Sequence, residues 1–131
     1  MPHLTLEYTA NLRDKHPDAA LFLTFHCLLE SIAGIKIENC KSRWREVDEW
    51  VVGTGVGPSA FVHLDLRFME GRPAEVKKAL GAALLEVLEA YFGPPPSGAD
   101  LQITVEVQEI PKAAYFKYPP GTLGPPPTTM V

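Results

Sequence analysis

The chain has 131 residues, of which 46% are hydrophobic and 21% charged, and its formal net charge is −4. This length suits one domain with a single core, and the composition is that of a soluble globular protein. The mild acidic excess argues against a nucleic-acid binder, although a few local arginines can still hold a small anion. No apolar run reaches the roughly 18 residues of a membrane span and no secretory signal opens the chain, so we expect a cytoplasmic protein with reduced cysteines.

The first half of the chain predicts a strand, a helix and a second extended segment. Residues 2–8 alternate between apolar and polar side chains, as a half-buried strand does. After a polar connection over 11–18, the next segment predicts a helix with Asp18 as its N-cap and Gly34 as its stop. Residues 41–52 mix tryptophans and valines with charges, which favours a strand or a hairpin arm. The expected buried stripe of the helix is Leu21, Phe25, Leu28, Leu29 and Ile32.

The second half repeats this order after a turn region at 53–59. Residues 60–69 alternate as a strand, and Pro73 opens a helix that ends at Gly93 and the prolines after it. Residues 101–110 alternate again. The tail after them is rich in proline and glycine, and its last ten or so residues are expected to be mobile or to lie on a neighbour. The expected buried stripe of the second helix is Val76, Leu80, Ala83, Leu84, Val87 and Tyr91.

The two halves echo each other, because HLTLEY at 3–8 and HLDLRF at 63–68 share His-Leu-x-Leu-x-aromatic. We therefore expect an α/β fold of two consecutive β-α-β units, over about 2–52 and 60–110, in one four-stranded sheet with both helices on one face. A sheet covered on one side leaves its other face for a partner, which predicts an oligomer. The expected domain spans 1–118, with a C-terminal tail over 119–131.

Pro2 is the first candidate for chemistry. If Met1 is removed, Pro2 becomes an N-terminal secondary amine, and burial and nearby cations lower the pKa of such a nitrogen toward the range of a general base. If Met1 remains, the nitrogen is an amide and cannot act as a base. A tolerated strand start is the competing interpretation, because a proline at the first position of a strand costs no ladder hydrogen bond.

Cationic side chains are the second group of candidates. On a strand, Lys41, Arg43 and Arg45 point to one face. Arg72 lies at a strand-to-helix turn, where an anion is favoured, and arginine holds carboxylates with two parallel hydrogen bonds. A solvated surface charge is the competing interpretation for each of them.

Histidines and glycines indicate no other chemistry. His3 and His63 occupy equivalent positions in the repeated strand, which favours a structural role for both. No histidine pair has a metal-ligand spacing, so no metal is expected. No glycine pattern that binds phosphate is present either.

Four stretches between Pro2 and about Tyr118 are informative in their order and spacing: PHLTLEYTANL, KSRWREVDEW, AFVHLDLRFMEGR and ITVEVQEIPKAAYFKY. Together they resemble the 5-carboxymethyl-2-hydroxymuconate isomerases of the tautomerase superfamily. The resemblance implies a homotrimer and an isomerase without a cofactor, which converts a small anionic dienol to its conjugated 2-oxo form in homoprotocatechuate degradation.

The same resemblance implies roles for particular residues. Pro2 is the implied general base and acid, and Arg43 the residue that binds a substrate carboxylate or polarises the 2-oxo group. Arg72 is a second implied carboxylate ligand, while Lys41 stands where family members often have arginine and lacks its fork. TANL departs from the more usual SDN after the first strand. Two alternatives stay open: a related N-terminal-proline hydratase, dehalogenase or decarboxylase, and a non-catalytic trimeric interaction protein.

Overall fold

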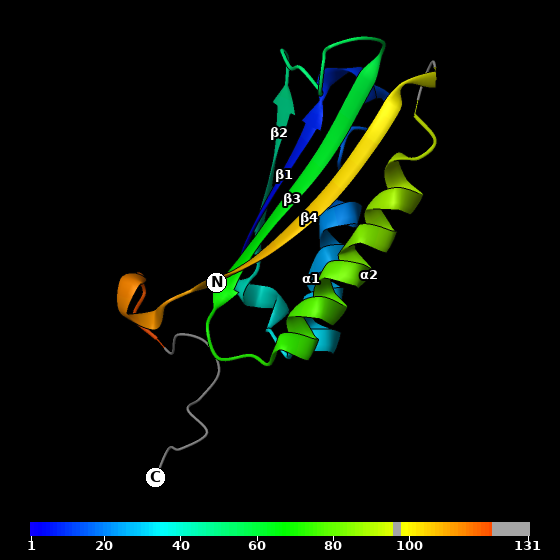
Figure 1. Ribbon diagram of the computed structural model, residues 1–131. Coiled ribbons are helices and arrows are strands. Elements are labelled where there is room, and N and C mark those ends of the chain that lie inside the picture. The colour runs from blue at the N-terminus through cyan, green and yellow to red at the C-terminus, as the bar shows by residue number, and fades with distance from the viewer. Residues whose placement is uncertain (96–97, 122–131) are drawn as a thin grey trace.

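The computed structural model describes residues 1–95 and 98–121 (Figure 1). Its strands are β1 (His3–Thr9), β2 (Lys41–Val47), β3 (Ser59–Met69) and β4 (Asp100–Ile110). The two long helices are α1 (Ala19–Ala33) and α2 (Ala74–Phe92), and short 3-10 helices occur at Ala10–Lys15, Ile37–Asn39 and Lys112–Ala114. The prediction for the last ten residues lies outside the described part of the chain.

The four strands form one sheet in the order β2-β1-β3-β4. β1 and β2 are parallel, as are β3 and β4, and each pair is joined through one of the long helices. The central pair, β1 and β3, is antiparallel, with His3 opposite Arg67 and Glu7 opposite His63. Both helices cover the same face of the sheet (Figure 1). The predicted pair of β-α-β units with helices on one face is confirmed.

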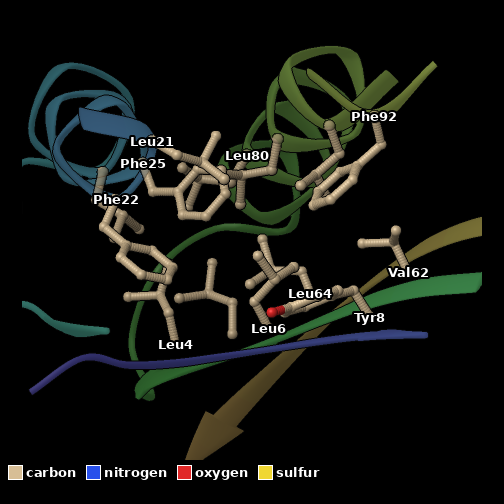
Figure 2. Packing of buried hydrophobic residues seen from close by; sticks show 14 of the residues in the cluster. Leu4, Leu6, Tyr8, Leu21, Phe22, Phe25, Val62, Leu64, Leu80 and Phe92 are labelled. Carbon is tan, nitrogen blue, oxygen red and sulfur yellow. The ribbon is translucent and has the colours of Figure 1, made fainter. Parts of the chain in front are cut away.

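The core lies between this face and the two helices. Alternate residues of the central strands point toward the helices, among them Leu4, Leu6 and Tyr8 from β1 and Val62 and Leu64 from β3 (Figure 2). The opposite side chains of the same strands remain partly accessible on the uncovered face. The alternation in the sequence therefore marked which side of each central strand meets the helices.

The buried stripes of the helices differ in part from the expected ones. α2 buries Leu80, Leu84, Leu88 and Phe92, whereas the expected Val87 and Tyr91 are only partly buried. This row advances by four residues at each step, so it drifts around the helix by about 40° per step, because a turn takes 3.6 residues. In α1 the expected stripe omits Phe22, which is 6% exposed.

Two segment boundaries also differ from the expected ones. The predicted strand over 41–52 ends at Val47, because its partner strand β1 ends at Thr9, which pairs with Val47. The predicted polar connection over 11–18 overlaps the 3-10 helix Ala10–Lys15, which buries Leu12 in the core. In the part of the chain that the structure describes, no helix has the length and apolar character needed to cross a membrane.

Candidate active site

Cationic groups surround the start of β1. Pro2 is buried, and its carbonyl oxygen accepts a hydrogen bond from the backbone N–H of Lys41 at 3.1 Å. The amine of Met1 and the side-chain ammonium of Lys41 both donate to the carbonyl oxygen of Asn39, at 3.1 and 3.0 Å. These contacts follow from the parallel pairing of β1 with β2, which puts His3 beside Lys41.

The chain terminus at this position has an unusual acidity. Burial, which is the largest cause, acts together with the hydrogen bond and charge of Lys41 and the charge of Lys117. They lower the pKa of the Met1 amine from 8.0 to about 5. An amine in these surroundings is neutral at pH 7, with its lone pair available to a proton. While Met1 is attached, the nitrogen of Pro2 is an amide and has no such lone pair.

Arg43 lies on the uncovered face of the sheet, close to the start of β1. Its Nη2 donates to Nδ1 of His3 at 2.8 Å, and Nε2 of His3 lies 2.9 Å from the hydroxyl oxygen of Tyr115. The neighbours of Arg43 on β2 point the other way: Ser42 bonds His26 of α1 at 2.7 Å, and Trp44 stacks on Phe22. The predicted alternation along β2 is therefore confirmed.

Arg43, His3 and Tyr115 line a concavity of about 680 Å³ on the uncovered face. Charges of both signs meet in it, including an ion pair of Arg67 with Asp65 at 3.1 Å. Among the described residues, no group of three or more His, Cys, Asp or Glu side chains is arranged to hold a metal ion. The other lining residues are Thr5, Glu7, Arg45, Asp65, Arg67, Glu106, Gln108, Ile110 and His63.

Arg72 lies apart from this concavity. Its Nε donates to the carbonyl oxygen of Ala33, the last residue of α1, at 3.0 Å, and its guanidinium carbon lies 5.5 Å from the ring centre of Phe68. Burial lowers the pKa of Arg72, although arginine stays charged throughout the range in which proteins fold. The structure thus brings Arg43 and Lys41 to the start of β1, while Arg72 caps the C-terminal end of α1.

Sequence reasoning gave His3 a structural role and assigned no role to Tyr115. A histidine repeated at the same position of two strands looks like part of the fold, and only the contacts distinguish the copies. His63, the second copy, bonds Thr104 at 2.7 Å and faces Glu106 at 3.3 Å instead of an arginine. The sequence held one signal for a role of His3 at the site, which is its position directly after Pro2. Its contact with Arg43 depends on the pairing of β1 with β2.

Two β-α-β units in one sheet, with cations gathered where the first strand begins, define a protein of the tautomerase superfamily. Its fold is similar to that of a fused 4-OT, a symmetric trimer, with a TM-score of 0.63 at 20% identity over 89% of this chain and 92% of that one. It is also similar to a crystal structure of a 5-carboxymethyl-2-hydroxymuconate isomerase from Deinococcus radiodurans R1. That TM-score is 0.79, at 33% identity over 88% of this chain and 87% of that one.

Sequence comparison gives the narrower assignment. The family model of 5-carboxymethyl-2-hydroxymuconate isomerase matches residues 2–120. The 5-carboxymethyl-2-hydroxymuconate Delta-isomerase of Escherichia coli is 26% identical over 117 residues, which cover 89% of this chain and 93% of that protein. The chain therefore belongs to the 5-carboxymethyl-2-hydroxymuconate isomerase family, and it is an isomerase. This confirms the family resemblance found in the sequence.

Proposed function

We propose that this isomerase converts a dienol acid, 5-carboxymethyl-2-hydroxymuconate or a close relative, to its conjugated 2-oxo form, with Pro2 as general base and acid. The setting of the chain terminus is the observation that carries the proposal. The burial and cations that lower the pKa of the Met1 amine surround the adjacent Pro2 as well. Removal of Met1 would therefore leave a secondary amine whose pKa the same burial and cations lower toward neutrality.

The reaction needs only the movement of one proton. The nitrogen of Pro2 accepts the proton of the 2-hydroxyl group, the electrons of that bond form the carbonyl, and the double bonds shift along the chain. The distal carbon then takes the proton from Pro2, so no atom is gained or lost. Arg43 binds the carboxylate beside the 2-oxygen in this scheme, in the ground state and the transition state alike, so its loss raises KM more than it lowers kcat.

The remaining cations bind the carboxylates of the substrate. Lys41 lies close enough to the terminus to lower its pKa, so it is near the reacting nitrogen. Arg72 lies outside the concavity and uses Nε for the carbonyl of Ala33, so a carboxylate of the substrate would have to reach its two terminal nitrogens. The small anionic substrate predicted from the sequence remains part of this proposal, and no cofactor enters it.

We also propose a homotrimer. One face of the sheet is covered by α1 and α2, whereas the other is a concavity lined by side chains of all four strands. Three copies arranged around an axis would cover this face in each of them. The solved fused 4-OT of the same fold is named as a symmetric trimer, which supports this arrangement.

The first experiment is an ultraviolet assay of dienol ketonisation with protein whose Pro2 terminus has been verified by intact mass. The matched control carries an uncleaved extension ahead of Pro2, which keeps every side chain and turns the reacting nitrogen into an amide. We expect kcat/KM to fall at least about 100-fold in the control, which is the size of a general-base contribution. Pro2→Ala tests whether a secondary amine is needed.

The alternatives make different predictions in the same assay. Equal and negligible rates in both proteins would contradict the proposed substrate. A search with other unsaturated acids would then separate a hydratase, dehalogenase or decarboxylase from an interaction protein without catalysis. If the protein is an enzyme of any of these kinds, its activity should depend on the free amine of Pro2.

A further inference from the structure

Three side chains that are distant in the sequence form a series of hydrogen bonds centred on His3, the residue after Pro2. Arg43 of β2 contacts Nδ1 of His3 at 2.8 Å, and Nε2 of His3 contacts the hydroxyl of Tyr115 at 2.9 Å. Tyr115 follows the 3-10 helix Lys112–Ala114, in the segment that leaves β4 and lies near the N-terminus (Figure 1). The imidazole of His3 is thus held on both ring nitrogens.

The chemistry of the two partners determines the form of the imidazole. A guanidinium has only donors, so Nδ1 of His3 must present its lone pair to Arg43. The ring proton of a neutral His3 is therefore on Nε2, where it is donated to the hydroxyl oxygen of Tyr115. A protonated His3 would turn an N–H toward Arg43, so that a donor would face a donor and a cation would face a cation.

We propose that neutral His3 is a positioning residue, which holds the Arg43 guanidinium at the start of β1 while Tyr115 holds the tautomer of His3. This inference rests on the proposed function in one respect, because Arg43 is there the group that meets the substrate. A long arginine side chain has many rotamers, and an acceptor at its tip restricts them. The segment after β4 thereby acts on the site through His3.

The charges around His3 favour its neutral form. Burial is the largest cause that lowers the pKa of His3, followed by the charges of Arg43, the chain terminus and Lys41. On the other side of β1, the residue of β3 that pairs with His3 is Arg67. Its charge is compensated by an ion pair with Asp65. Because the unfolded chain takes up this proton first as the pH falls, the imidazole stabilises the fold above pH 6.5 and loses that contribution below it.

A kinetic experiment separates positioning from a purely structural role. His3→Leu removes the acceptor, and we expect KM to rise about tenfold with a smaller change in kcat, as for a lost hydrogen bond to a charged group. His3→Asn keeps an acceptor at the place of Nδ1 and does not titrate. We expect it to restore KM at pH 7. In the unchanged protein, protonation of His3 below pH 6.5 should raise KM, and His3→Asn should not show this rise.

The duplicated strand offers a matched control. His63 occupies the equivalent position of β3 and bonds Thr104 instead of an arginine, so His63→Leu removes an imidazole of the same concavity without disturbing an arginine and should raise KM less than His3→Leu does. If His3→Leu and His63→Leu had the same KM, or if the low-pH rise of KM persisted in His3→Asn, the positioning role would be wrong. Adding Arg43→Ala to His3→Leu should raise KM no further than Arg43→Ala alone.

A measurement without turnover distinguishes failure of this inference from failure of the proposed function. Nitrogen-15 NMR of the imidazoles in the full chain should show His3 with its proton on Nε2, and Arg43→Ala should raise the pKa of His3 because it removes a neighbouring cation. An unchanged His3 titration in Arg43→Ala would overturn the inference. If the dienol assay fails and this titration still shifts, the substrate proposal falls and the pairing of His3 with Arg43 stands.

Discussion

Arg43 and Arg72 carry the same charge but have different surroundings. Arg43 points into the concavity of the uncovered face and meets the neutral ring of His3. Arg72 donates to the carbonyl of Ala33, one of the orphan acceptors at the end of α1, and lies over the ring of Phe68. Cations near a helix C-terminus also interact favourably with the helix dipole. The two arginines should therefore differ in their contribution to folding.

Substitution of each arginine tests this difference. Arg72→Ala should lower the free energy of unfolding by about 1–2 kcal/mol, because it removes the bond to Ala33 and the contact with Phe68. Arg43→Ala should lower it by less than Arg72→Ala does, because it removes one hydrogen bond of a partly accessible side chain and no contact with an aromatic ring. Both should lower kcat/KM for the dienol. If Arg72→Ala and the unchanged protein had equal midpoints in chemical denaturation, the contact of Arg72 with Ala33 would contribute nothing to the stability of the fold.

Helix α1 illustrates how local signals define an element. The side chain of Asp18 accepts a hydrogen bond from the backbone N–H of Leu21 at 3.0 Å, which is the predicted N-cap. Gly34 has φ 67°, in the left-handed region that favours glycine, and its N–H donates to the carbonyl of Glu30 at 3.0 Å. Both helix ends read from the sequence are confirmed because each depends on residues within one turn.

Substitution of two glycines by alanine tests how far the local backbone conformation determines stability. Gly34→Ala should destabilise the protein by about 1 kcal/mol, because a Cβ there meets no neighbour and the cost is only that of a left-handed backbone. Gly81→Ala, inside α2, should stabilise it by about 0.5–1 kcal/mol, since its Cβ would make an ordinary contact with Val107 at 3.8 Å. Denaturation of the two variants should shift the midpoint in opposite directions. A destabilised Gly81→Ala would indicate strain between α2 and β4.

At the scale of the whole molecule, the uncovered face and the segment after β4 belong together. Tyr115 contacts β1 across 112 positions of the chain, whereas Phe116 and Tyr118 are 88% and 93% exposed. Two large aromatic side chains left accessible beside an open sheet face are suited to contact another copy. We propose that the domain ends near residue 118 and that residues 119–131 are dispensable for assembly.

Truncation tests this boundary. A chain that ends at Tyr118 keeps the contact of Tyr115 with His3, so sedimentation should give the same oligomer as the full chain, and KM should be unchanged. A chain that ends at Ala114 lacks this contact and should show a raised KM. Loss of the oligomer in the chain ending at Tyr118 would mean that the last residues hold a neighbouring subunit.

The sequence by itself determined the features that depend on near neighbours. Strand alternation, the caps of α1 and the repeated HLxLx strand are set by residues a few positions apart, and together they predicted two β-α-β units with helices on one face. The stripe of α2 and the end of β2 were less predictable, because the first depends on how the helix drifts across the core and the second on where β1 stops.

Only the tertiary structure decided which candidate residues meet. The antiparallel pairing of β1 with β3 puts the start of β1 beside the end of β3, and β4 runs parallel to β3, so the segment after it reaches His3. The same arrangement carries Arg72 to the end of α1, 39 positions away, and not to Arg43. Contacts between residues so distant in the sequence depend on strand order and register, which local patterns of side chains do not predict.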